Sequence, residues 1–195
     1  MSIENLVQKK EKMRESQGYI QFSPDELNAL SLKQVEMLVR HWHGHTMMRL
    51  PEEEIAFFEW LKKEDPDVWN DLWGDGEDSY MVSIDLLPQF LKEKNNFPIC
   101  DLRDTDNYYF THEHIKSKGR EEMPAIIEKT DSNTPLNLDE LLLFELHIAP
   151  IDIWHFCYRY DAPLKTVKTM IDDMVYKGWI VHLTDSEDLV RYIDV

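Results

Sequence analysis

The last third of the chain decides the fold, and residues 137–195 read NLDELLLFELHIAPIDIWHFCYRYDAPLKTVKTMIDDMVYKGWIVHLTDSEDLVRYIDV. Asn137 and Glu140 form an N-cap and N3 pair, so we expect a helix to begin at Leu138. Pro150 ends that helix, because proline cannot continue the helical hydrogen-bond ladder. Apolar residues occupy almost every face of the helix, which is typical of a helix that is covered on more than one side.

Two more helices and two strands are expected after it. Residues 151–160 and 164–177 carry apolar side chains at helical spacing, so each has one core-facing stripe. Gly178 stands where a helix ends in a left-handed C-cap. Residues 179–183 and 189–193 are rich in β-branched and aromatic side chains, as strands are, and a polar loop separates them.

This order of three helices, a glycine and two strands resembles the winged-helix modules of helix-turn-helix regulators. The segment APLKTVKTMIDDMVYKGWI, residues 162–180, is similar to their third helix and first wing strand. The resemblance covers about 59 of 195 residues and concerns the fold, not an activity. It implies a compact module of three helices and a hairpin.

In many winged-helix proteins the third helix enters the major groove of DNA. The resemblance therefore makes candidate nucleic-acid contacts of four residues, Lys165, Thr166, Lys168 and Thr169. Charge argues against this role, since residues 137–195 contain 5 Lys or Arg and 11 Asp or Glu. Non-specific DNA affinity comes mostly from neutralising phosphates. We therefore expect this module to dock on a protein instead.

The composition is that of a folded, acidic protein. Hydrophobic residues make up 43% of the chain and aromatic residues 11%, which is typical of a globular protein. The net charge of −17 disfavours nucleic acids and anionic membranes, and it leaves a basic partner or DNA mimicry open. Two cysteines form no disulfide framework. The N-terminal residues lack secretory-signal features, and no apolar run reaches membrane-spanning length, so we expect a cytoplasmic location.

The first part of the chain, residues 1–73, is expected to be a helical unit. Residues 2–16 form either a short amphipathic helix that docks on the unit or another subunit, or a charged tail. Four further helices have recognisable start signals, which lie at Ser23, Ser31, Pro51 and Asp65. The aromatic side chains of residues 57–73 are expected to form core.

The middle part, residues 74–136, is expected to be a small mixed α/β segment. Its boundary is the glycine-rich and acidic stretch 74–78. Strand-like residues at 80–84 precede a helix at 85–94, and a hairpin is expected from residues 97–102 and 107–110. Loops are expected at 116–120 and 130–135. The fold class is thus α+β and mainly helical, with three parts that are able to close into one compact body.

Two histidine clusters are candidate metal sites. His41, His43 and His45 alternate, and alternating side chains share one face of an extended chain. We expect a helix end here, however, where imidazoles favour the negative end of the helix dipole without any metal. His112 and His114 follow a predicted strand.

Glu113 between these two histidines is a candidate general base, and Cys100 and Asp101 on the neighbouring predicted strand are possible further ligands. The ligand spacing matches no established zinc motif. We therefore expect no cofactor, and a divalent metal such as zinc is the alternative.

Three hypotheses follow from the sequence. The preferred one is a non-enzymatic adaptor or regulatory protein that contacts a protein partner through its C-terminal module. The surplus apolar surface of residues 138–148 and 55–73 is expected to close the two halves of the chain together or to form a homodimer. The alternatives are a metal-dependent, hydrolase-like enzyme that uses the histidine clusters, and a DNA-binding transcriptional regulator that uses the lysines and threonines of residues 165–169.

Overall fold

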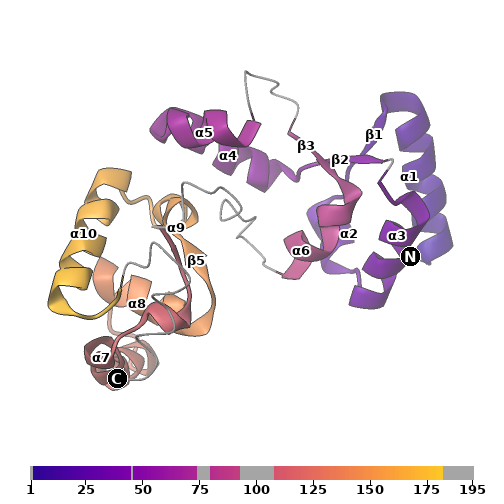
Figure 1. The fold of residues 1–195 in the computed structure, drawn as a ribbon. Coiled ribbons are helices and arrows are strands. Elements are labelled where there is room, and N and C mark those ends of the chain that lie inside the picture. Colours follow the sequence, from indigo (N-terminus) through magenta and orange to yellow (C-terminus); the bar gives the residue numbers. More distant parts are fainter. Residues whose placement is uncertain (1, 45, 74–79, 93–107, 182–195) are drawn as a thin grey trace. The chain divides into compact units, whose positions relative to one another are not determined.

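A computed structural model describes residues 2–44, 46–73, 80–92 and 108–181. The described residues are mainly helical and include two small sheets, so the predicted α+β class is confirmed (Figure 1). The chain divides into two compact units, Met1–Phe97 and Pro98–Val195. This division falls inside the predicted middle segment and not at residues 74–78, because a strand that follows those residues joins the sheet of the first unit.

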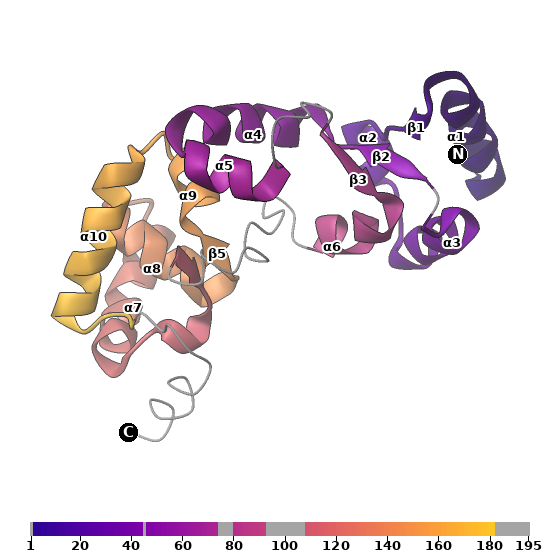
Figure 2. The same cartoon turned by 45° about the horizontal axis from the view of Figure 1, so that its top comes forward.

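The first unit is built from short elements around a three-stranded sheet (Figure 2). In chain order the elements are α1 (Ile3–Gln17), β1 (Tyr19–Ile20), α2 (Pro24–Asn28), α3 (Leu32–Trp42), β2 (Met47–Arg49), α4 (Glu52–Glu64), α5 (Pro66–Trp73), β3 (Met81–Ser83), the 3-10 helix η1 (Ile84–Leu86) and α6 (Leu87–Lys92). Strand β2 is central, with β1 parallel to it and β3 antiparallel. Met48 of β2 lies opposite Ile20 and Val82, and all three are buried.

The predicted helix starts of the first unit are confirmed. Ser23 accepts the Glu26 N–H, and the Glu26 side chain accepts the Ser23 N–H in return. Ser31 and Gln34 form the same reciprocal pair at the start of α3. Each pair satisfies two backbone donors that a helix terminus otherwise leaves without partners.

Aromatic side chains form the core beneath α4 and α5, as predicted. Phe58 contacts Trp69 and Trp73, and both tryptophans contact Tyr80. Phe58 and Trp69 are buried. Ring pairs of this kind add roughly 0.5–1.5 kcal/mol beyond the burial of their area, so this cluster fixes the two helices against each other.

A buried lysine joins α1 to the rest of the first unit. Lys10 is 1% exposed, and its Nζ donates to the Gln21 carbonyl and, at 2.5 Å, to Glu26. The same ammonium group lies over the ring of Phe22. Of the two alternatives for residues 2–16, the docked helix is therefore correct.

Burial also affects the pKa values of this pair. Burial lowers the pKa of Lys10, although the hydrogen bond to Glu26 opposes that shift. Burial alone would raise the pKa of Glu26, but hydrogen bonds from Lys10, Lys9 and the Ser23 N–H outweigh it and lower the value to about 2. The Glu26 carboxylate is thus held in its ionised form.

In the part that the structure describes, residues 108–181, the second unit packs four α-helices with a two-stranded sheet. In chain order the elements are β4 (Tyr109–Phe110), the 3-10 helix η4 (His112–His114), α7 (Ser117–Asp131), α8 (Leu138–Ile148), β5 (Ile151–Asp152), α9 (Ile153–Arg159) and α10 (Leu164–Lys177). Strands β4 and β5 are antiparallel, with Phe110 opposite Ile151. An isolated bridge pairs Ile115 with Ile180.

The helices expected in residues 137–178 are present. The capping box of Asn137 and Glu140 opens α8, and α10 ends at Gly178, whose φ is 75°. Helix α9 begins two residues later than predicted, because residues 151 and 152 pair with β4 before Asp152 caps the helix. The expected second wing strand lies outside the described residues, so the winged-helix arrangement stays a prediction. The expected strand at 97–102 also lies outside them.

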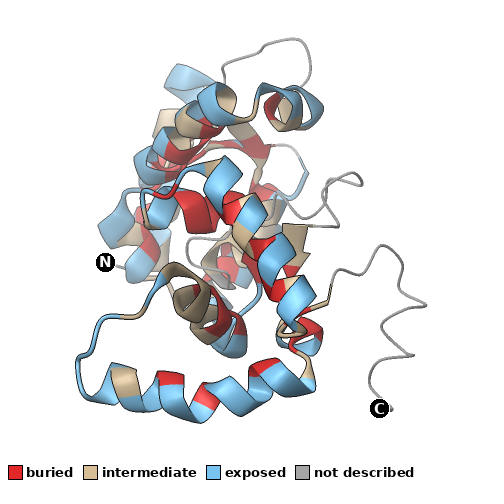
Figure 3. Cartoon of the chain, turned by 90° about the vertical axis from the view of Figure 1, so that its left-hand side faces the viewer, coloured by how far each residue is buried: buried red, intermediate tan, exposed pale blue. Residues whose placement is uncertain are grey.

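Helix α7 was not predicted, and the expected loop at 116–120 is wrong from Ser117 onward. Gly119 and Pro124 both lie within this helix. Most of α7 is exposed, and its buried residues Gly119, Met123 and Ile126 form one narrow stripe (Figure 3). A Cβ on Gly119 would lie 2.3 Å from the Trp179 carbonyl oxygen, so glycine is required where α7 meets the chain after α10.

Candidate functional site

The first histidine cluster does not converge in the described residues. His41 Nε2 lies 3.2 Å from Glu11 Oε1, and the Trp42 indole donates to that same oxygen at 2.7 Å. His43 Nδ1 instead faces Asp85 Oδ1 at 3.5 Å. His45 lies outside the described residues. Each described histidine of this cluster therefore lies beside a different carboxylate, on a different element.

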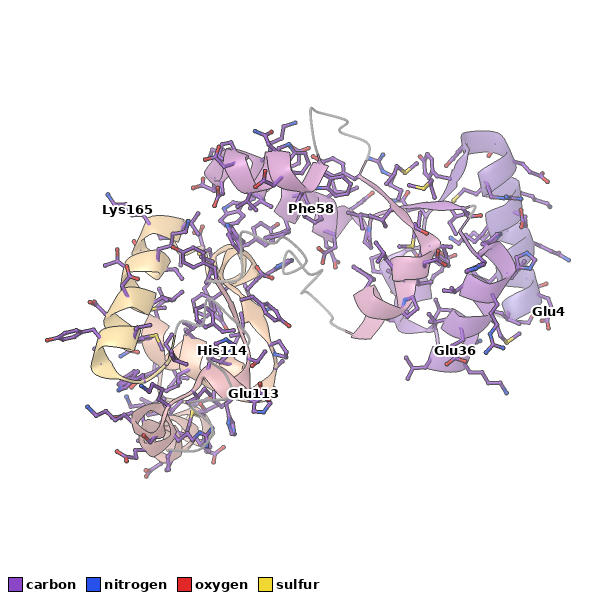
Figure 4. All side chains as sticks on the ribbon, in the orientation of Figure 1. Glu4, Glu36, Phe58, Glu113, His114 and Lys165 are labelled. Carbon is purple, nitrogen blue, oxygen red and sulfur yellow. The ribbon has the colours of Figure 1, made fainter. Side chains whose placement is uncertain are left out.

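The second cluster separates into a buried and an exposed part. His114 is buried, and its Nδ1 accepts the Thr111 N–H at 3.0 Å, so it completes the cap of η4. His112 and Glu113 are exposed; Glu113 and His114 are labelled in Figure 4. Within the described residues, no three side chains of metal-binding type come together. Cys100 and Asp101 lie outside those residues.

Two of the three basic side chains of α10 make contacts inside the second unit. Lys168 Nζ lies 4.7 Å from the centroid of the Tyr108 ring, and Lys177 pairs with Asp139 at 3.3 Å. Lys165 is exposed at the N-terminal end of α10 (Figure 4). Thr166 and Thr169 are exposed as well, and Thr169 donates to the Lys165 carbonyl.

Charge does not concentrate into a positive surface on this unit. Residues 108–181 hold 8 Lys or Arg and 12 Asp or Glu. Two of the three lysines on α10, at positions 168 and 177, pack against an aromatic ring or a carboxylate of the same unit. A DNA-contacting helix needs cations that are available to phosphates. No observation on the described residues favours the DNA hypothesis, and the same is true of the metal hypothesis.

A groove along α8 is the strongest candidate; the sequence predicted surplus apolar surface on this helix, but not the groove. It encloses about 380 Å³ and we name it the α8 groove. Its lining residues come from the loop after α7, from one side of α8 and from the end of α9; they are Thr130, Asn133, Thr134, Pro135, Leu136, Leu141, Phe144, Glu145, Ile148 and Tyr160.

The amphipathic spacing of α8 explains why this groove is apolar. Leu142, Leu143 and Leu146 are fully buried in the core of the second unit. The groove residues of α8 recur at i, i+3, i+4 and i+7, which places them on one face of the helix. On that face Ile148 is 67% exposed. The signal was visible in the sequence as a helix with apolar residues all round.

The loop wall of the groove is held by backbone hydrogen bonds. Asn133 adopts a left-handed conformation with φ of 58°, which asparagine tolerates better than most residues. The Thr134 N–H donates to the Lys129 carbonyl at 2.8 Å, and the Asn133 N–H donates to Thr130. Lys129 also pairs with Glu140, and its hydrogen bond lowers the pKa of that carboxyl. These contacts join the end of α7 to the start of α8.

Glu145 and Tyr160 form the polar end of the groove. Glu145 accepts from Arg159 Nη1 at 2.5 Å through one oxygen and from the Tyr160 hydroxyl through the other. Burial, helped by the bond to Glu145, raises the pKa of Tyr160 to about 12. Tyr160 therefore stays protonated and donates at any physiological pH. Phe156 packs against its ring with centroids 4.9 Å apart.

A second feature that the sequence reading missed is a buried acid–histidine pair. Asp152 and His155 are 1% and 4% exposed, and Asp152 Oδ2 lies 2.6 Å from His155 Nδ1. The other oxygen of Asp152 accepts the His155 N–H at 2.9 Å. An aspartate three residues before a histidine at a helix start is the signal that was available. The pair fixes the junction of β5 and α9, which is a structural role.

Comparison with known protein families, with characterised proteins and with solved structures finds no match to this chain. Among the described residues, none of the helices has the length and apolar character that crossing a bilayer requires. The α8 groove offers aliphatic and aromatic side chains, one carboxylate and one hydroxyl, which are groups that bind a ligand or a partner.

Proposed function

We propose that this chain is a non-enzymatic adaptor or regulatory protein of the cytoplasm that holds a protein partner in the α8 groove. The observation that carries the proposal is the second apolar face of α8, where Leu141, Phe144 and Ile148 line an open groove opposite the buried face. Exposed apolar surface that is contiguous and bordered by polar groups is a common mark of a protein contact site. A chain of 195 residues with two cysteines, of which Cys157 is buried, fits a reducing compartment.

The size of the groove indicates a reversible contact. Burying an exposed aliphatic or aromatic side chain contributes roughly 1.5–3 kcal/mol when burial is complete. The groove side chains of α8 are partly buried already, so covering them gives only a part of that amount for each. Association costs at least about 4 kcal/mol of lost freedom. The difference between the free energy gained by burial and the cost of association favours a moderate affinity. Such an affinity suits a regulated contact better than a permanent complex.

The hydrogen-bonded loop wall supports the same proposal. A partner that enters a preformed groove does not have to order the loop, and this lowers the cost of binding. The left-handed Asn133 and the Lys129–Glu140 pair hold that wall in place without a partner.

Site-specific photo-crosslinking in cells of the source organism tests this proposal. A photoreactive amino acid at Ile148 lies in the groove, whereas the same amino acid at Ile127, an exposed isoleucine of α7 outside the groove, is the matched control. We expect a discrete adduct with another protein from position 148 that position 127 does not give. Equal adducts from both positions, or none from position 148, would contradict the proposal.

A further inference from the structure

We infer that the partner presents a short, basic amphipathic helix to the α8 groove, with apolar side chains one helical turn apart and a lysine or arginine beside them. This inference rests on the proposed function, since it names the chemistry of the partner that the groove binds. Three features of the groove carry it: the spacing of its apolar residues, its charge and the geometry of Glu145.

The spacing of the groove residues matches a helix. Leu141, Phe144 and Ile148 run along two turns of α8, which is about 10 Å. A helix laid beside them brings side chains at i, i+3 or i+4, and i+7 onto the same length, as in other helix-in-groove contacts. A volume of about 380 Å³ has room for two or three such side chains.

The charge of the groove selects a basic helix. Glu145 is the one acidic side chain among the ten lining residues, which include no lysine or arginine. The segment 130–148, which supplies most of the groove, contains four carboxylates and no lysine or arginine. Three of these carboxylates already pair with cations of the same unit, Asp139 with Lys177, Glu140 with Lys129 and Glu145 with Arg159, so the local excess of negative charge is small. The net charge of −17 also attracts a cationic segment over a longer range. A second copy of the chain would bring another −17 to the contact, so charge disfavours it.

Glu145 is able to accept a further donor. Each of its oxygens accepts one hydrogen bond, from Arg159 or from Tyr160. A carboxylate offers about four lone-pair positions, so an incoming guanidinium or ammonium group can share the carboxylate without displacing Tyr160. The Glu145 side chain is 18% exposed and the Arg159 side chain 34%, so this pair is reachable from the groove.

Peptide binding to the full chain tests the inference. The probes are fluorescein-labelled amphipathic peptides of about 14 residues, one of leucine and lysine and one of leucine and glutamate with the same pattern. By fluorescence anisotropy at about 0.15 M salt, we expect the leucine–lysine peptide to bind about tenfold more tightly than the leucine–glutamate peptide. The variant Ile148→Asn should weaken the leucine–lysine peptide about fivefold, and Glu145→Gln about threefold.

Ile127→Asn is the matched control, because it makes the same change on an exposed face outside the groove, and it should leave binding unchanged. If Ile148→Asn binds the basic peptide as tightly as the unmodified chain does, the attraction is only general surface charge and the inference is overturned. If the acidic peptide binds better and depends on Ile148, the partner chemistry is wrong although the groove still binds a protein.

Light scattering tests whether the occupant of the groove is a second copy of the chain. A concentration-dependent dimer that Ile148→Asn abolishes would identify the occupant as a second copy and would overturn the inference. If the peptide test fails but position 148 gives a crosslink, the inference of a basic helical partner is rejected and the proposed function is not. Failure of the crosslink would reject the proposed function itself.

Discussion

At the scale of single residues, the buried pair of Asp152 and His155 offers the sharpest test of stability. Replacing Asp152 by alanine removes the N-cap of α9 and leaves a buried imidazole without its carboxylate. Breaking a buried pair of this kind costs about 3–5 kcal/mol. We expect a loss of that order in urea unfolding of the full chain, measured by a probe in residues 108–181.

Asp173→Ala is the control for this change, because Asp173 is exposed on α10. Its expected effect lies within about 0.5 kcal/mol. Equal stability of the two variants would show that the pair contributes nothing to the junction of β5 and α9.

The Glu26 carboxylate gives a pH-dependent prediction at the same scale. Its pKa is about 2 in the folded chain, below its ordinary value of 4.5. Its stabilising contribution is therefore complete above about pH 4.5 and is lost as the pH falls toward 2. We expect the free energy of unfolding of Glu26→Gln to fall less steeply than that of the unmodified chain as the pH decreases from about 4.5 toward 2. Urea unfolding at several pH values measures this difference.

The pKa shifts of Lys10 and Glu26 have opposite effects on the free energy of unfolding, although both pKa values are lowered. The lowered pKa of Lys10 reflects a burial cost for the ammonium group, so the net contribution of the pair is smaller than the Glu26 shift suggests. Lys10 stays protonated throughout the acid range, however. Of the two residues, only Glu26 therefore makes the free energy of unfolding depend on pH in that range. Glu36→Gln, an exposed glutamate of α3, should leave this pH dependence unchanged.

At the scale of elements, helix starts could be predicted and strand pairings could not. Ser23, Ser31 and Asn137 each cap a helix through a partner three residues later, which is a local signal that the sequence contains in full. Strand β5 depends instead on β4, about 40 residues away in the chain, so periodicity alone assigned its residues to α9. The apolar surface of α8 and the loop at residues 130–135 were each predicted, but the groove between them was not, because how a loop packs against a helix is not a local property of the sequence.

Helix α7 was missed for a different physical reason. Its N-cap, Lys116, makes no side-chain capping bond, and glycine and proline interrupt the helical signal. Gly119 carries a prediction of its own. Gly119→Ala would gain about 1 kcal/mol of helix propensity, but its Cβ would lie 2.3 Å from a carbonyl oxygen of the backbone.

The clash should outweigh the propensity, because the Lys116 N–H donates to that same Trp179 carbonyl. We expect Gly119→Ala to destabilise the second unit by about 1–3 kcal/mol in thermal unfolding. Glu121→Ala, an exposed change on the same helix, should be close to neutral. A stabilised Gly119→Ala variant would show that α7 shifts freely at this contact.

At the scale of the whole molecule, the two compact units lead to a prediction about cooperativity. Each unit has its own buried core, which is what allows a unit to unfold by itself. Hydrogen exchange read by mass spectrometry should localise the two residue-scale variants. Glu26→Gln should raise exchange in the first unit, residues 1–97, and Asp152→Ala should raise it in residues 108–181 of the second. Faster exchange in both units from either variant would show one cooperative body.

The Lys10 contact has a practical consequence for following α1. Its amine is sealed between Gln21, Glu26 and the Phe22 ring, whereas the side chain of the adjacent Lys9 is 57% exposed. An acylating reagent should therefore label Lys9 quickly and spare Lys10 for as long as α1 remains seated. The ratio of acylation at Lys10 to acylation at Lys9 therefore reports how often α1 detaches from the rest of the first unit.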